Sequence, residues 1–204
     1  MKNVNRRIRR LRRAELPADT IELARYLIGK TLVHDSPAGR SSGRIVETEA
    51  YPVGDAAAHA FRGETPGNRS LFLERGFAYV YFAYGSSWMM NVTSEKPGVG
   101  GGVLVRALEP IEGIEMMMSR RGTTNIKDLA RGPGRLARAL AIDKSFDGAD
   151  LCFNGPLWLG AAVRKTAPII AASVRIGITR DAERVLRFYE RSSQFVSGPK
   201  RLRE

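Results

Sequence analysis

Short runs of mostly apolar residues, bounded by glycine, proline and polar residues, recur along this chain, and such runs are typical of β-strands. The strands predicted in this way span residues 30–34, 44–50, 78–83, 88–93, 103–108, 171–178 and 186–190. The third and fourth are separated by a short glycine- and serine-containing segment, so we expect them to form a β-hairpin.

Three other segments predict helices. The first follows Pro17, where Asp19 can cap the helix, Glu22 stands at the third helical position and Gly29 can end it. The other two span residues 110–120 and 132–141, and the latter has proline in its first turn. Many strands with few helices between them predict an α+β fold: a single mixed domain with a mainly antiparallel curved sheet, flanking helices and a protruding β-hairpin.

Length and composition support one domain. The 204 residues are 43% apolar, which is enough to enclose a core and a pocket, and no linker or internal repeat divides the chain. We expect a flexible basic arm over 1–14, the folded domain over 15–198 and a short basic tail over 199–204.

The chain is strongly cationic. It has 33 basic residues against 21 acidic ones and a net charge of +12, and 26 of the bases are arginine. Because guanidinium groups match phosphate oxygens, a polyanion is the first partner to consider. Charge that serves only solubility is the alternative.

The cysteine and histidine counts exclude disulfide-stabilised folds and structural zinc sites. Cys152 stands alone, so an internal disulfide is impossible, and His34 and His59 are too few for a structural zinc site. We therefore expect no metal and a reducing compartment. No apolar run reaches the about 20 residues that span a bilayer, so we expect no membrane partner. The arginines of 6–13 suit either an organelle transit peptide or a basic arm, and we favour the arm.

The candidate chemistry begins at the run 43–51, which contains Glu47 and Glu49. Residues two apart on a strand share a face, so both carboxylates should point the same way. His59 and the tyrosines of the predicted hairpin follow. A carboxylate, a histidine and several aromatic rings can hold a flat heterocycle and activate a water molecule beside it.

Several motifs, in order, resemble the alkyladenine (3-methyladenine) DNA glycosylase family. They are Gly-Arg-Ile-Val-Glu-Thr-Glu-Ala-Tyr at 43–51, the segment 65–69, the hairpin Tyr-Val-Tyr with Met-Asn-Val at 90–92, and the segments 106–110, 132–134, 140–142, 143–146, 174–177 and 187–189. The resemblance runs from about residue 16 to residue 197.

The resemblance implies the catalytic residues. It selects Glu49 as the general base and places Arg106 beside it to help hold the attacking water. Glu47 is then left with a structural pairing role. Without the motif, an isolated glutamate near a strand end is more often a solvated or salt-bridged side chain, and Arg106 more often an ordinary ion-pair partner.

The resemblance also implies the binding residues. Tyr51, His59 and Tyr81 resemble the walls of a base pocket, where aromatic faces favour cationic N-alkylated purines. Asn91 matches a residue that disfavours the exocyclic amino group of undamaged guanine. Tyr84, at the hairpin tip, resembles the wedge that fills the space left by an extruded nucleotide. Read alone, the tyrosines would more often be core residues and His59 a polar surface residue.

The predicted function is base excision repair: a monofunctional DNA N-glycosylase flips alkylated purines such as 3-methyladenine out of duplex DNA and hydrolyses the N-glycosidic bond, leaving an abasic site. We expect a monomer without cofactors that acts on duplex DNA containing damaged purines, in the nucleoid-associated cytoplasm of a bacterium or the nucleus of a eukaryote.

Three other functions remain open. A non-catalytic nucleic-acid-binding domain could use the same basic and aromatic surface. A bifunctional glycosylase with lyase activity needs an amine nucleophile, and none of the seven lysines stands in a pocket motif. Zinc-dependent deamination lacks its ligands.

Overall fold

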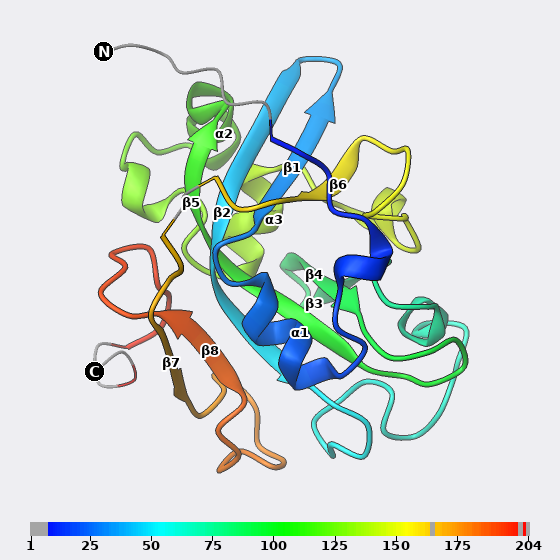
Figure 1. Ribbon diagram of the computed structural model, residues 1–204. Helices are drawn as coiled ribbons and strands as arrows, with labels where there is room; N and C mark the ends of the chain where they lie inside the picture. Colours follow the sequence, from blue (N-terminus) through cyan, green and yellow to red (C-terminus); the bar gives the residue numbers. More distant parts are fainter. Residues whose placement is uncertain (1–7, 164–165, 200–201, 203–204) are drawn as a thin grey trace.

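The computed structural model describes residues 8–163, 166–199 and 202. An eight-stranded antiparallel sheet forms its centre (Figure 1). Six strands follow one another in the order β3-β4-β5-β2-β1-β6, while β8 joins β2 and β7 joins β8. The strands are β1 (Thr31–Ser36), β2 (Gly39–Tyr51), β3 (Ala78–Ala83), β4 (Ser87–Thr93), β5 (Gly102–Glu112), β6 (Leu157–Gly160), β7 (Ile170–Ser173) and β8 (Arg187–Glu190).

The long strand β2 is the axis of this sheet. One of its edges pairs with β5 along most of its length. Residues of its first half pair with β1, whereas Glu47, Thr48 and Glu49 pair with β8. The curled single domain with its antiparallel sheet confirms the predicted α+β class, and each of the seven predicted strands has a counterpart.

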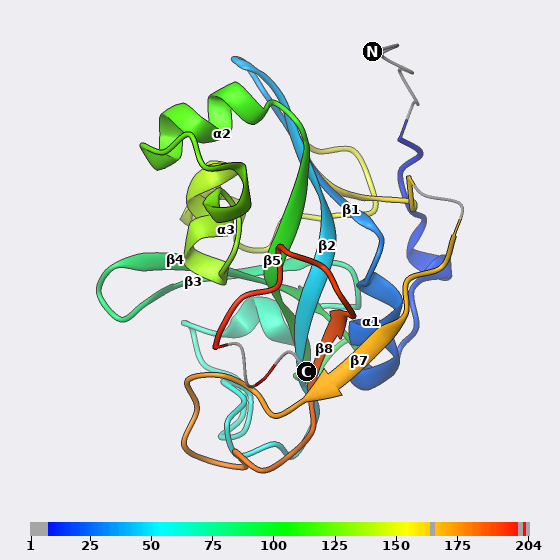
Figure 2. The ribbon, with the colours of Figure 1, turned by 90° about the vertical axis from the view of Figure 1, so that its left-hand side faces the viewer.

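Helices cover both sides of the sheet. Figure 2 shows α1 (Thr20–Leu27) on one side and α2 (Ile114–Arg121) with α3 (Pro133–Ala139) on the other. The Asp19 side chain caps α1, as predicted, by accepting hydrogen bonds from the amides of Ile21 and Glu22. Leu23 and Leu27 of α1 are fully buried in the core. Four 3₁₀ turns complete the fold: Arg13–Glu15, Arg69–Phe72, Ile126–Asp128 and Lys144–Phe146.

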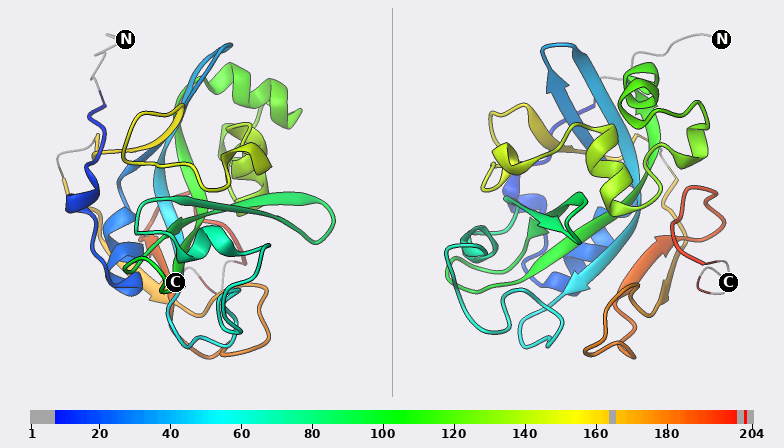
Figure 3. Two further views of the ribbon diagram at one scale, coloured as in Figure 1. Left: turned by 90° about the vertical axis from the view of Figure 1, so that its right-hand side faces the viewer. Right: turned by 180° about the vertical axis from the view of Figure 1, so that it is seen from behind.

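The β3–β4 hairpin projects from the side of the sheet that carries α2 and α3, as Figures 2 and 3 show. Its two strands are in register from Ala78 opposite Val92 to Ala83 opposite Ser87. The protruding hairpin is therefore confirmed.

Two predicted boundaries are wrong. The segment 110–120 was expected to be helical from its start, but β5 continues to Glu112 and α2 begins only at Ile114, after Gly113 at a left-handed φ of 70°. Pro110 stays in the strand because it pairs with Gly43 beside a bulge in β2, where a lost ladder hydrogen bond is tolerated. The strand expected over 171–178 ends at Ser173, and the residues after it form a loop.

The sequence also contains a strand that we did not predict. β6 has only four residues, all of them buried, and so short an apolar run gives no clear strand signal in the sequence. It pairs with β1 at the edge of the sheet.

The N-terminal arm lies partly among the described residues. Residues 1–7 are outside them, but Leu11 is buried and Arg13 donates to Asp150. Within the described parts of the chain, no helix is long and apolar enough to cross a membrane.

Gly43 allows β2 and β5 to approach closely. A Cβ atom there would lie 2.8 Å from Leu108 Cβ and 3.1 Å from the Glu109 carbonyl oxygen. We predict that Gly43→Ala lowers the free energy of unfolding by about 1–3 kcal/mol, because backbone and core must shift. Urea denaturation measures the change. Gly67→Ala is the control, since its Cβ would meet only Thr65 Oγ1 at 4.0 Å; equal losses in both variants would contradict the steric argument.

Candidate active site

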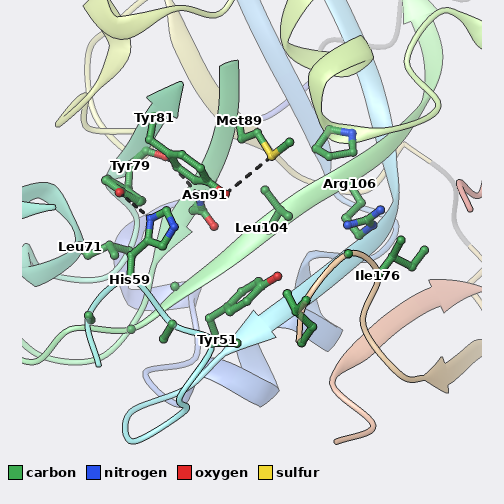
Figure 4. Close-up of a pocket in the computed structure, with 18 of the residues that line it drawn as sticks. Tyr51, His59, Leu71, Tyr79, Tyr81, Met89, Asn91, Leu104, Arg106 and Ile176 are labelled. Carbon is green, nitrogen blue, oxygen red and sulfur yellow. Dashed lines mark hydrogen bonds between the residues drawn. The ribbon is translucent and has the colours of Figure 1, made fainter. Parts of the chain in front are cut away.

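A cavity of 390 Å³ opens between the β3–β4 hairpin, β5 and the loops that follow β2 and β7 (Figure 4). Six of the seven predicted site residues line it: Tyr51, His59, Tyr81, Tyr84, Asn91 and Arg106. The structure thus brings together residues from four strands and loops. The seventh, Glu49, is fully buried and contacts three residues that line the cavity, Tyr51, Arg106 and Ile176.

Aromatic rings form one wall. Tyr79 and Tyr81 stack with centroids 5.3 Å apart, and the His59 ring meets Tyr81 edge-on at 4.4 Å. His59 Nδ1 is 2.8 Å from the Tyr79 hydroxyl. Burial lowers the pKa of His59, so the imidazole is held neutral at neutral pH. Burial, followed by the neighbouring Tyr84 and Glu49, raises the pKa of Tyr81 to about 12.

Glu49 lies at the end of β2, beside Tyr51 and Arg106, and both of its carboxylate oxygens accept hydrogen bonds. Oε2 accepts hydrogen bonds from the Tyr51 hydroxyl and from an Arg106 guanidinium nitrogen, each at 3.0 Å. Oε1 accepts one from the Ile176 amide at 2.8 Å. Burial and the adjacent Glu49 raise the pKa of Tyr51, which keeps its hydroxyl a donor. The carboxylate is therefore fixed in one orientation.

Glu47 has the structural role that we expected. It is fully buried and does not line the cavity. Its Oε1 accepts hydrogen bonds from Arg106 Nε at 3.1 Å and from Arg187 Nε at 2.6 Å. Its Oε2 accepts a hydrogen bond from the Ser197 backbone amide at 2.6 Å. Burial would raise the pKa of Glu47, but Arg106 and Arg187 outweigh it and lower that pKa. Both glutamates contact Arg106, which confirms that they share one face of β2.

A second buried ion pair fastens the loops of the cavity, and sequence reasoning missed it. The side chains of Arg175 and Asp55 are fully buried, and Arg175 Nη2 lies 2.8 Å from Asp55 Oδ2. Arg175 also donates to the Ala50 and Asp181 carbonyl oxygens and lies 4.6 Å over the Tyr51 ring. This pair holds the loop before His59 against the loop that presents the Ile176 amide to Glu49. The two residues are 120 positions apart and belong to no periodic pattern, so the sequence offers no signal for their contact.

Asn91 and Tyr84 differ greatly in exposure. Asn91 is buried, and its side-chain amide donates to the Tyr79 carbonyl oxygen at 3.4 Å. Tyr84 is 81% exposed at the hairpin tip, with a left-handed φ of 53°. Its hydroxyl donates to the Gly177 carbonyl oxygen at 3.4 Å, across the mouth of the cavity. Among the described residues, no group of three His, Cys, Asp or Glu side chains could hold a metal ion.

Comparison with known proteins now adds to this geometry. The family model described as methylpurine-DNA glycosylase (MPG) matches residues 14–194. The chain belongs to this glycosylase family. A Mesorhizobium japonicum protein named "Putative 3-methyladenine DNA glycosylase" is 66% identical over 94% of this chain and 92% of its own length. Proteins of the same name from Paraburkholderia phytofirmans and Chlorobium phaeobacteroides are 53% and 47% identical, over 94% and 89% of this chain and 90% and 92% of their own lengths.

Membership of the methylpurine-DNA glycosylase family makes the chain a DNA glycosylase, and it confirms the family that the sequence motifs indicated. The matched segment 14–194 contains all seven predicted site residues.

The Arg175–Asp55 pair leads to a prediction about this glycosylase. Asp55→Asn removes one partner and leaves the buried guanidinium without its counter-charge, so we expect a loss of about 3–5 kcal/mol in the free energy of unfolding. Thermal or urea unfolding measures it. Glu64→Gln is the matched control, because the Glu64–Arg69 pair is exposed and 3.7 Å apart. A change in Asp55→Asn no larger than that of Glu64→Gln would show that the pair does not fasten the loops.

Proposed function

We propose that this DNA glycosylase flips alkylated purines such as 3-methyladenine out of duplex DNA and hydrolyses the N-glycosidic bond with a water molecule activated by Glu49. The observation that carries the proposal is the buried Glu49 carboxylate, held by Arg106, Tyr51 and the Ile176 amide behind an aromatic cavity. A fixed anion next to a pocket for a flat ring is what this reaction needs.

The chemistry balances with water alone. The oxygen of water forms a bond to the sugar carbon C1′ while the N-glycosidic bond breaks, and its electron pair leaves with the purine. The proton of water passes to Glu49, whose negative charge also opposes the positive charge that develops on the sugar. An abasic site and a free purine result.

The hydrogen bonds select the oxygen of Glu49 that takes the proton. Oε2 already accepts two hydrogen bonds and Oε1 only one, and a carboxylate oxygen accepts about two. Oε1, beside Ile176, therefore has the remaining acceptor position. Because Glu49 is fully buried, water must enter together with a small displacement of the residues that cover it.

The cavity favours cationic purines over normal ones. The faces of Tyr51 and Tyr81 attract a positively charged ring. Neutral His59 adds no opposing charge, and the charge of Arg106 is offset by Glu47 and Glu49. Alkylation of a purine ring nitrogen also makes the base a better leaving group. Asn91 is buried and lines the cavity, and we propose that it disfavours the exocyclic amino group of guanine.

The hairpin supplies the means of extrusion. Tyr84 projects at its tip while the cavity lies beside it, so one insertion into the minor groove can fill the vacated stack and guide the base inward. We propose a monofunctional enzyme because no lysine is among the described residues that line the cavity, and lyase chemistry needs an amine nucleophile.

One prediction of this proposal concerns Glu49. Glu49→Gln keeps the size of the side chain but removes the base, so single-turnover release of 3-methyladenine from duplex DNA should fall by at least about 100-fold while lesion binding persists. Free base and strand scission are measured separately in the same reaction, without added alkali.

Glu22→Gln is the control for Glu49→Gln, because Glu22 is exposed on α1, across the sheet from the hairpin. Near-normal release by Glu49→Gln would remove this residue from the mechanism. If the unaltered protein bound lesion DNA without releasing base, it would be a binding domain, and strand scission would reveal a lyase.

Another prediction of this proposal concerns Tyr84. Tyr84→Ser should disfavour the extruded base by about 1–3 kcal/mol, the size of an aromatic–base stacking contact, which is about 5- to 150-fold in the flipping equilibrium. The loss should be smaller when the lesion is mispaired, because less unpairing opposes extrusion. A fluorescent base analogue follows flipping.

Tyr84→Phe separates the ring from the hydroxyl that donates to Gly177. A wedge role requires this variant to stay near normal while Tyr84→Ser loses flipping. Equal losses for Tyr84→Ser on paired and mispaired lesions, with flipping unaffected, would assign Tyr84 to packing instead.

A further inference from the structure

The face of the hairpin that looks away from the active site forms a second hollow, which we call the rear groove. It has a volume of 450 Å³ and lies between the hairpin and α3, and its lining includes Phe82, Trp88, Arg121, Arg135 and Arg138. Neighbouring residues of a strand point to opposite faces. Tyr81 opposite Met89 therefore lines the active-site cavity, whereas Phe82 opposite Trp88 lines the rear groove.

The rear groove combines cationic and flat apolar groups. The Phe82 and Trp88 rings lie 4.9 Å apart, and Phe82 is 52% exposed. Arg121, Arg135 and Arg138 lie near one another: burial lowers the pKa of Arg121, and the like charges of the other two lower it further. Such repulsion is a cost in the protein alone and is relieved when an anion binds between the cations.

The hydrogen bonds of these arginines leave donors for an anion. Arg121 donates a hydrogen bond from Nε to the Leu129 carbonyl oxygen, and Arg138 donates one from Nε to the Arg120 carbonyl oxygen. Arg135 contacts Asp128 at 3.3 Å with one nitrogen, and its side chain is 51% exposed. A second acid, Asp143, lines the groove. Positive charge remains in excess, and guanidinium groups bind phosphate oxygens with two parallel hydrogen bonds.

The position of the groove indicates which phosphates it meets. The minor groove of B-DNA is about 6 Å wide and is bounded by two backbones. A hairpin that enters it has one backbone on each face. The extruded base must lie in the active-site cavity, so the damaged strand runs along that face and the other strand along the opposite one.

We propose that the rear groove binds the phosphate backbone of the strand opposite the lesion, through Arg121, Arg135 and Arg138. The inference rests on the proposed function, because the base in the cavity is what assigns each strand to a face. The arginines then hold the undamaged strand while the lesion is extruded, and Phe82 and Trp88 cover the sugars.

The test compares duplex and single-stranded DNA that carry the same lesion. In Arg135→Gln/Arg138→Gln, the slope of log affinity against log salt should decrease on duplex DNA by about 0.9 for each phosphate that is no longer neutralised. On the single strand, slope and base release should match those of the unaltered protein, because the strand that the rear groove binds is missing. A methylphosphonate linkage in the undamaged strand should lower the slope of the unaltered protein in the same way, and should have no further effect on the variant.

Arg12→Gln/Arg25→Gln is the control with the same loss of charge, since both residues are exposed and belong to the N-terminal segment and α1. It should leave the duplex slope unchanged. An unchanged slope in Arg135→Gln/Arg138→Gln, or an equal decrease on duplex and single strand, would overturn the rear-groove proposal. Absence of base release by the unaltered protein on both substrates would instead overturn the proposed function.

Discussion

The buried ion pairs of Glu47 with Arg106 and Arg187 are the interaction on which both fold and site depend. They join β2, β5 and β8 in the centre of the sheet, and Ser197 closes the network from the C-terminal segment. Taking such charges out of water is costly, so the network adds little net stability, but loss of Glu47 would leave the buried Arg187 without this counter-charge. The same Arg106 reaches Glu49. The Arg106 side chain that Glu47 holds in place therefore also fixes the orientation of Glu49, the proposed catalytic base.

The cavity is built from parts of different rigidity. Tyr51, Tyr81 and Arg106 lie on paired strands, whereas His59 and Ile176 lie on loops. The His59 loop is held by the Tyr79 hydroxyl and the Asn68 side chain, and the Arg175–Asp55 pair connects both loops with the end of β2. Side chains on loops are positioned less precisely than those on strands, so a buried ion pair that fixes these loops matters for the geometry of the cavity.

The two faces of the β3–β4 hairpin differ in their side chains. One face carries tyrosines and leads to the cavity, and the other carries Phe82 and Trp88 beside a cluster of arginines. The alternation of side chains along two short strands thus gives one projecting element two different surfaces, which we propose to bind the damaged base and the phosphates of the other strand. If both proposals hold, this arrangement lets a small domain treat the two strands of a duplex differently.

Local patterns in the sequence were enough to predict α1 with its Asp19 cap, the strands, the hairpin and the common orientation of Glu47 and Glu49, because these features depend on neighbours within a few residues. The motifs selected Glu49 and six of the residues that line the cavity: Tyr51, His59, Tyr81, Tyr84, Asn91 and Arg106. Only the tertiary structure revealed the Arg175–Asp55 pair, the Ile176 amide on Glu49, the continuation of β5 through Pro110 and the four-residue β6. Each of these depends on contacts between segments far apart in the chain, where pairing and burial override local propensity.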